Sequence, residues 1–141
     1  MNILVVHGPN LHLLGRRDPA LYGSATLAQL NAEIKKHAAS LGVKVRVFQA
    51  NGEGELIDWL TANAPWADAL AINPGAYTHY SYALRDAIEA LGLPAAEVHL
   101  TDISKREPFR RVSVIKPVCL RQFKGEGPVS YFKALSFLAK K

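Results

Sequence analysis

The 141-residue chain has one cysteine, Cys119, so no internal disulfide can form, and we expect a cytoplasmic location. No apolar run approaches the ~18 residues that a membrane-spanning helix needs, and the first residues lack the pattern of a secretion signal. Charged residues make up 21% of the chain, with a formal net charge of +5. The sequence has no basic stripe of the kind that marks a nucleic-acid surface. An anionic small substrate, or contacts within an oligomer, would explain the positive net charge equally well.

Several chemistries lack their sequence motifs. The histidines are not at metal-ligand spacing and no cysteine pair exists, which argues against a zinc site. No glycine-rich dinucleotide fingerprint, Walker sequence or FMN phosphate loop follows the first strand. Lys105 is the only lysine in the loops expected around a cleft, and its charged surroundings argue against a Schiff base. We therefore expect neither a metal nor a cofactor.

The chain alternates between apolar runs typical of buried strands and the periodicity of helices. Five strands are predicted, at residues 3–6, 43–48, 69–72, 95–100 and near 118–123. Four helices are predicted: 27–41 with a capping box from Thr26 and a stop at Gly42, 55–63, a third capped by Thr78, and a last one from Gly127-Pro128.

Strict alternation of strand and helix implies right-handed crossovers and a parallel sheet. We predict one catalytic domain over residues 1–141, a flavodoxin-like three-layer α/β sandwich with strand order 2-1-3-4-5 and helices on both faces. Ligands bind such sheets beyond the carboxyl ends of the strands, near the switch point between strands 1 and 3. Polar residues that follow strands 1, 3 and 4 should therefore meet in one cleft: Asn10, Arg16, Arg17, Tyr22, Asn73, His79, His99, Thr101, Arg106 and Arg110.

The connection at residues 7–23 is unusually long for a strand-to-helix loop, and long loops are often functional lids. It contains Arg16, Arg17 and Tyr22. An arginine beside a tyrosine stabilises the phenolate and makes the phenol a usable base. Only one of two adjacent arginines is expected to point inward. The alternative is a surface loop whose arginines are solvated.

Glu97 and His99 are two residues apart on a strand, so their side chains leave the same face. A carboxylate beside an imidazole fixes its tautomer and favours its protonated form, which suits a general acid. Alternatively, His99 could be a strand-end histidine whose hydrogen bonds are satisfied within the fold and which has no catalytic role. His79 could either bind a hydroxylated ligand or face water. His7 and His12 could be strand-end or loop residues without a ligand.

Four segments resemble the type II 3-dehydroquinate dehydratase family: GPNLHLLGRRDPALYG, EGELIDWL, INPGAYTHYSYALRDAI and EVHLTDISKREPFRRVS. The likeness runs in order from Asn2 to about Ser113 and weakens beyond it. It implies dehydration of 3-dehydroquinate to 3-dehydroshikimate through an enolate, without metal or cofactor, in the shikimate pathway or in quinate catabolism.

Carried over by position, the resemblance implies that Tyr22 removes a proton at C2 and that Arg17 keeps Tyr22 ionised. Asn10, with a water, would stabilise the enolate oxygen. His99, oriented by Glu97, would protonate the departing C1 hydroxyl. The implied substrate-binding residues are Asn73 and the backbone at Leu100 and Thr101 for the carboxylate, and His79 and Arg110 for ring hydroxyls. The family implies a homo-oligomer, a dodecamer built from trimers, in which Asp86 reaches a neighbour's site.

Some residues depart from the family pattern without removing a residue assigned to chemistry. His7 and His12 stand where asparagines are common, and Lys105 replaces a small residue. Asp102 adds a negative charge near an anionic ligand, unless Lys105 or an arginine pairs with it. Two alternatives stay open: a non-catalytic flavodoxin-like binding or regulatory protein, and an enzyme acting on a related cyclic hydroxy acid.

Overall fold

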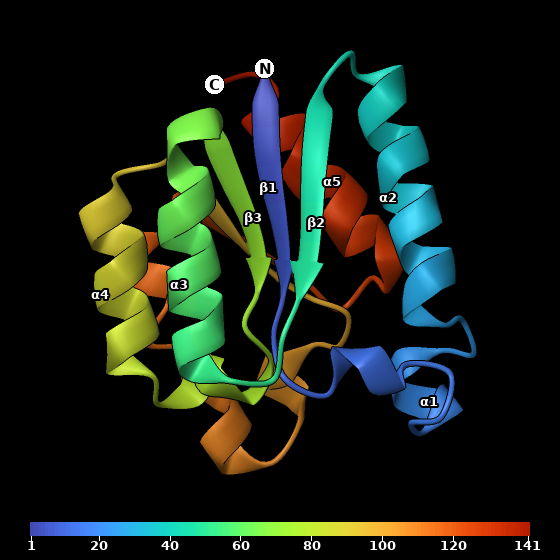
Figure 1. Cartoon of the computed structure of the whole chain (residues 1–141). Coiled ribbons are helices and arrows are strands. Elements are labelled where there is room, and N and C mark those ends of the chain that lie inside the picture. Colours follow the sequence, from blue (N-terminus) through green and yellow to red (C-terminus); the bar gives the residue numbers. More distant parts are fainter.

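Five parallel strands form one sheet in the computed structural model, which describes residues 1–141 (Figure 1). The order is β2-β1-β3-β4-β5, so the predicted arrangement 2-1-3-4-5 is confirmed. The strands are β1 (Asn2–His7), β2 (Lys44–Gln49), β3 (Ala69–Asn73), β4 (Ala95–His99) and β5 (Arg121–Lys124).

Helices cover both faces of the sheet, with α3 and α4 on one side and α2 and α5 on the other (Figure 1). They are α1 (Pro19–Tyr22), α2 (Leu27–Ser40), α3 (Glu53–Asn63), α4 (Tyr82–Leu91) and α5 (Pro128–Leu138). Side chains of a strand alternate between the two faces, so β1 contributes to two cores. Ile3 and Val5 pack in the core under α2 and α5, whereas Leu4 and Val6 pack under α3 and α4.

The start of α2 is the predicted capping box. The Thr26 hydroxyl accepts from the Gln29 amide at 3.2 Å, and the Gln29 side chain accepts from the Thr26 amide at 2.9 Å. Two backbone donors that a helix start leaves unpaired are thereby satisfied. Gly42, in the left-handed region at φ 71°, follows the end of the helix as predicted.

Two sequence predictions are wrong in detail. Thr78 does not cap α4: it lies in a 3-10 helix, Gly75–His79, and α4 begins three residues later with Ser81 accepting from the Leu84 amide at 3.0 Å. The last strand begins at Arg121 rather than near residue 118. Residues Lys116–Val118 form a 3-10 turn around Pro117, which has no N–H to give to a sheet.

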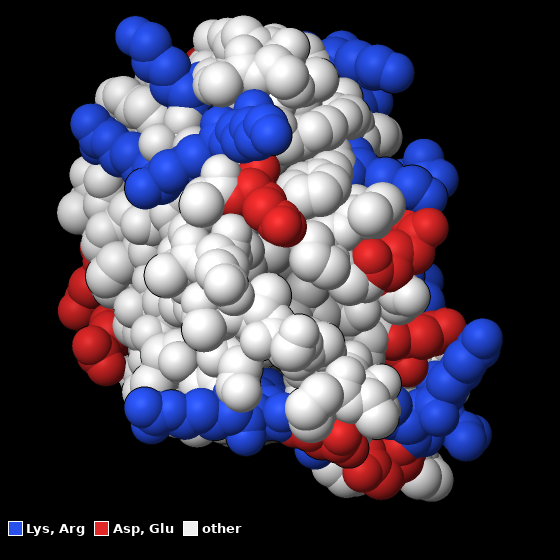
Figure 2. Space-filling view, turned by 90° about the vertical axis from the view of Figure 1, so that its right-hand side faces the viewer, with Lys and Arg blue, Asp and Glu red and all other residues white.

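Charged side chains do not form a continuous basic stripe on the face that Figure 2 shows. Lysine and arginine gather near its upper part and along its lower edge, with a broad uncharged area between them. This view adds nothing in favour of a nucleic-acid surface. No helix in the structure has the length and apolar character needed to span a membrane.

Gly8 allows the loop after β1 to touch the loop after β3 at the switch point of the sheet. Its amide donates to the Asn73 carbonyl at 2.7 Å. A Cβ on Gly8 would lie 2.4 Å from the carbonyl oxygen of Pro74, far inside van der Waals contact. The absence of a side chain is therefore what lets the two loops meet.

Gly8→Ala should lower the free energy of unfolding by about 1–3 kcal/mol, because the new methyl group forces the two loops apart. The matched control is Gly54→Ala on the exposed side of α3, where an added Cβ meets nothing within 4 Å. That change should be neutral or stabilising by up to about 1 kcal/mol. Equilibrium urea unfolding measures both, and equal stabilities of the two variants would contradict the prediction.

Candidate active site

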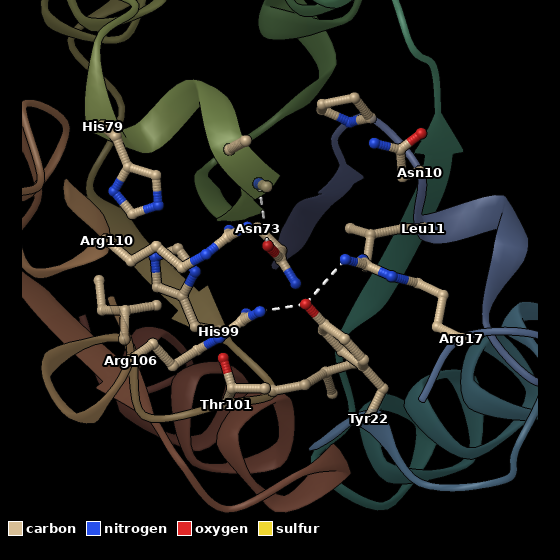
Figure 3. A pocket seen from close by; sticks show the side chains of 15 residues that line it. Asn10, Leu11, Arg17, Tyr22, Asn73, His79, His99, Thr101, Arg106 and Arg110 are labelled. Carbon is tan, nitrogen blue, oxygen red and sulfur yellow. Dashed lines mark hydrogen bonds between the residues drawn. The ribbon is translucent and has the colours of Figure 1, made fainter. Parts of the chain in front are cut away.

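A pocket lies beyond the carboxyl ends of β1, β3 and β4, where the topology places a ligand site (Figure 3). It brings together most of the residues selected from the sequence. Of those, the pocket is lined by Asn10, Arg17, Tyr22, Asn73, His79, His99, Leu100, Thr101, Arg106 and Arg110. No lysine and no carboxylate is among its lining residues, so the wall is polar and cationic.

Tyr22 presents its phenol oxygen to two guanidinium groups. Arg17 Nη2 and Arg106 Nη1 each donate to that oxygen at 2.7 Å (Figure 3). The Arg17 guanidinium carbon also lies 3.8 Å from the centre of the Tyr22 ring. Arg16 is exposed and does not line the pocket, so Arg17 is the inward-pointing member of the pair. Two charged donors on one oxygen stabilise its anionic form.

His99 is held by Glu97 at the end of β4. The imidazole Nε2 lies 2.7 Å from Glu97 Oε1, and both residues are buried. Because Nε2–H donates to the carboxylate, Nδ1 is the nitrogen left for a ligand. His99 lines the pocket, whereas Glu97 lies behind it. The predicted same-face placement of the two side chains is what the structure shows.

The Glu97 carboxylate is buried yet surrounded by donors. Thr78 donates to Oε1, Ser113 contacts both oxygens at 2.8 and 3.0 Å, and Gln122 Nε2 donates to Oε2 at 3.0 Å. Burial by itself would raise the pKa of Glu97. The hydrogen bond and charge of His99, helped by the two hydroxyls, outweigh burial and hold that pKa below its usual value. The lowered pKa favours the ionised carboxylate, which accepts the hydrogen bond from His99 Nε2–H.

His79 and Arg110 line the side of the pocket formed by the 3-10 segments after β3 and β4. His79 Nδ1 donates to the Val112 carbonyl at 2.7 Å, which leaves Nε2 as an acceptor in the neutral ring. Burial is the main cause that lowers the pKa of His79, and the charge of Arg110 acts in the same direction. Arg110 is steadied by its Nε, which donates to Glu107 at 2.6 Å. Together they offer one acceptor and several donors to a hydroxylated ligand.

Asn73 ends β3, and its side chain projects into the pocket (Figure 3). Its Nδ2 donates to the Tyr131 hydroxyl at 3.0 Å, and its Oδ1 accepts from the Gly75 amide at 3.1 Å. Behind it, His7 Nδ1 lies 2.8 Å from the Tyr131 hydroxyl, and His7 Nε2 lies 2.8 Å from Asn31 Oδ1. His7, which the sequence suggested could be a strand-end residue without a ligand, is a fully buried member of a chain of hydrogen bonds that reaches the pocket.

Other sequence candidates have different positions. Asn10 lines the pocket with a left-handed backbone, φ 69°, a conformation that asparagine tolerates. Asp86 is exposed on α4 and does not reach this chain's pocket. Asp102 also lies outside the pocket; Lys124 and Lys105 approach it at 3.6 and 3.9 Å, so its charge has cationic neighbours.

Sequence reasoning missed the contacts of four residues that shape the site. Arg106 was placed in the cleft, but nothing in its charged segment indicated that it would reach the Tyr22 oxygen. Thr78, Ser113 and Gln122 hold Glu97 from three different segments. Only Gln122 carried a usable signal: it falls in the predicted fifth strand, which neighbours the fourth, and the structure pairs it with Glu97.

A phenol and an imidazole on different walls of one cationic pocket define an α/β enzyme of the acid–base kind. The comparison with known proteins gives the family. The model of the family described as "Dehydroquinase class II" matches residues 1–139, and the chain belongs to that family.

Similar proteins cover nearly all of the chain. The 3-dehydroquinate dehydratase of Pelotomaculum thermopropionicum is 53% identical over 96% of this chain and 94% of its own. The 3-dehydroquinate dehydratase of Roseiflexus castenholzii is 51% identical over 98% and 88%. The crystal structure of the type II dehydroquinase from Butyrivibrio crossotus superposes with a TM-score of 0.95 at 41% identity, covering 98% of this chain and 97% of that one.

The buried His7 should make the fold sensitive to mild acid. Burial lowers the pKa of His7 from 6.5 to about 4, so between these values the unfolded chain binds a proton that the folded chain does not. Stability therefore falls as pH falls through this window, by about 3 kcal/mol in total at ~1.4 kcal/mol per pKa unit.

Urea unfolding of the parent protein and of His7→Asn at pH 7 and pH 4 measures this loss. We expect the parent to lose about 3 kcal/mol more than His7→Asn does. His12→Asn, a change of an exposed histidine, serves as the control and should follow the parent. An identical pH dependence in the parent and His7→Asn would contradict the prediction.

Proposed function

We propose that this protein dehydrates 3-dehydroquinate to 3-dehydroshikimate through an enolate, with Tyr22 as the base and His99 as the acid. The observation that carries the proposal is the pair of guanidinium groups, Arg17 and Arg106, that each donate to the Tyr22 oxygen at 2.7 Å. A tyrosine in that environment is equipped to accept a proton. Membership of the class II dehydroquinase family, whose relatives named above are 3-dehydroquinate dehydratases, supplies the substrate.

The first step is removal of a proton from C2 of the substrate by the Tyr22 phenolate. The electron pair of the C2–H bond moves to the C3 carbonyl oxygen and forms an enolate. Arg17 and Arg106 stabilise the phenolate by charge-assisted hydrogen bonds. Asn10, on the wall formed by the loop after β1, stabilises the enolate oxygen with a water as intermediary.

The second step is loss of the C1 hydroxyl. The C3 carbonyl re-forms from the enolate, the electrons of the C2–C3 double bond move to form the C1–C2 double bond, and the C1–O bond breaks. The leaving oxygen takes a proton from Nδ1 of His99, which enters this step as the imidazolium with a proton on each ring nitrogen, and departs as water. Glu97, ionised and fixed by its donors, holds Nε2–H and keeps the ring oriented toward the pocket. Proton exchange with solvent then restores Tyr22 and His99.

Substrate binding uses the remaining polar wall of the pocket. Asn73 and the backbone at Leu100 and Thr101 hold the carboxylate, and His79 and Arg110 hold ring hydroxyls. The support for this assignment is that all five line the pocket and that no carboxylate lines it to repel an anion.

The direct test is to mix purified protein with 3-dehydroquinate and record the ultraviolet absorption of the conjugated enone product. We expect a steady rise in absorbance at nanomolar enzyme. A flat trace at micromolar enzyme would overturn the proposed activity and favour a binding or regulatory role for the fold.

Replacing the residues around the phenol should separate chemistry from binding. Tyr22→Phe should lower kcat by about 10²–10⁴-fold while substrate still binds, because that is the usual contribution of general-base catalysis. Arg17→Ala and Arg106→Ala should each lower kcat by about 10–100-fold, the worth of one charged hydrogen bond. Each should also move the limb of the pH–rate profile that reports the base to higher pH.

Arg16→Ala is the matched control, since Arg16 adjoins Arg17 in the chain but is exposed. It should leave kcat and the pH–rate profile nearly unchanged. If Arg17→Ala and Arg106→Ala had normal kcat, an unmoved pH profile and only a raised KM, the two arginines would bind substrate and not activate Tyr22.

We also propose that the protein is a trimer-based oligomer, a dodecamer, in which Asp86 reaches a neighbouring site. Exposed apolar residues near Asp86 and the pocket support an interface there: Tyr80, Tyr82 and Phe109 are 59%, 64% and 59% exposed. Light scattering should give a mass of about 185 kDa, twelve times the 15.4 kDa of the chain. A mass near 15.4 kDa at working concentration would contradict the proposal.

A further inference from the structure

We propose that His7, held by Asn31, is a positioning residue that fixes the amide of Asn73 through the Tyr131 hydroxyl. In this relay the substrate carboxylate meets the N–H side of the Asn73 amide. The proposal deepens the function given above and rests on it, since Asn73 is the residue assigned there to the carboxylate. His7, Tyr131 and Asn73 are all buried, and Asn73 alone lines the pocket.

The direction of the relay follows from one donor that cannot change, the backbone amide of Gly75. It donates to Asn73 at 3.1 Å, so the atom that Asn73 turns to it is Oδ1. Nδ2 therefore faces the Tyr131 oxygen, 3.0 Å away, and that oxygen is an acceptor for Asn73. The Tyr131 hydrogen is then free for only one neighbour, the Nδ1 of His7 at 2.8 Å.

The hydrogen bonds at the His7 end of the relay are consistent with this direction. Nδ1 of His7 accepts from Tyr131, so a neutral ring carries its proton on Nε2. Asn31 Oδ1, 2.8 Å from Nε2, accepts the hydrogen bond from that Nε2–H. Each hydrogen bond from Gly75 to Asn31 thus pairs one donor with one acceptor, and no buried side-chain nitrogen or oxygen lacks a partner. The low pKa of His7 adds support, because the ring stays neutral near pH 7.

The relay matters because a carboxamide has nearly the same shape when turned over. A turned amide would present its oxygen to the anionic substrate and its NH₂ to the Gly75 N–H. Nδ2 has two hydrogens: one is used by Tyr131, and the other is available to a ligand in the pocket. Fixing that orientation before binding removes an ordering cost that the substrate would otherwise bear.

The kinetic test compares two replacements of His7 with Tyr131→Phe. His7→Leu removes the acceptor, whereas His7→Asn keeps a short side chain whose oxygen can accept from Tyr131. The carboxylate is unchanged through the reaction, so its binding is equal in ground and transition states. We expect His7→Leu and Tyr131→Phe to raise KM about 5- to 30-fold with kcat within twofold, and His7→Asn to restore KM to within about twofold of the parent.

A purely structural role gives a different result: less active protein and a lower kcat, with an unchanged KM in His7→Leu and Tyr131→Phe. That result, or a failure of His7→Asn to restore KM, would overturn the relay. If the parent itself does not turn over 3-dehydroquinate, the proposed function fails, and the relay is judged by a second measurement.

That measurement is solid-state ¹⁵N NMR of histidine-labelled protein, with the His7 signals assigned by their loss in His7→Asn. We expect a proton on Nε2 and none on Nδ1 from pH 5.5 to pH 8. Asn31→Leu, which removes the acceptor for Nε2–H, should shift the tautomer balance toward Nδ1–H. A ring protonated on Nδ1 in the parent would overturn the relay whatever the turnover.

Discussion

The buried charge of Glu97 is the interaction on which the arrangement of the site depends. A carboxylate without solvent is tolerable only when donors replace the water, and here they come from β4, β5 and two loops. Thr78 belongs to the segment after β3, Ser113 to the connection between β4 and β5, and Gln122 to β5. One charge therefore fixes three segments and, through its hydrogen bond, the orientation of His99, the proposed acid.

Tyr22, the proposed base, is positioned by different means. Tyr22 lies on the short helix α1 in the long connection before α2 and remains partly exposed. Its oxygen is fixed by Arg17 from the same loop and Arg106 from the segment after β4. The proposed acid thus lies at the carboxyl end of an interior strand, while the proposed base belongs to a loop held by two arginines.

The sequence was informative where the physics is local or periodic, and less so where contacts cross the chain. The alternation of buried strands and helices predicted the sheet order, and the Thr26 capping box predicted the start of α2. The wrong cap at Thr78 shows the limit: its hydroxyl has two possible uses, and the partner that decides between them, Glu97, is 19 residues away. The meeting of Arg106 with Tyr22, 84 residues apart, likewise has no local signature.

His7 shows how a departure from a family pattern can depend on a second residue. A neutral imidazole has one donor and one acceptor nitrogen, and burial requires that both be satisfied. Tyr131 supplies a donor, but Nε2–H needs an acceptor, which Asn31 provides from α2. Without that acceptor the buried N–H would cost about 1–3 kcal/mol. A buried histidine at this position is therefore stabilised by a polar residue at position 31, and the two positions form one structural unit.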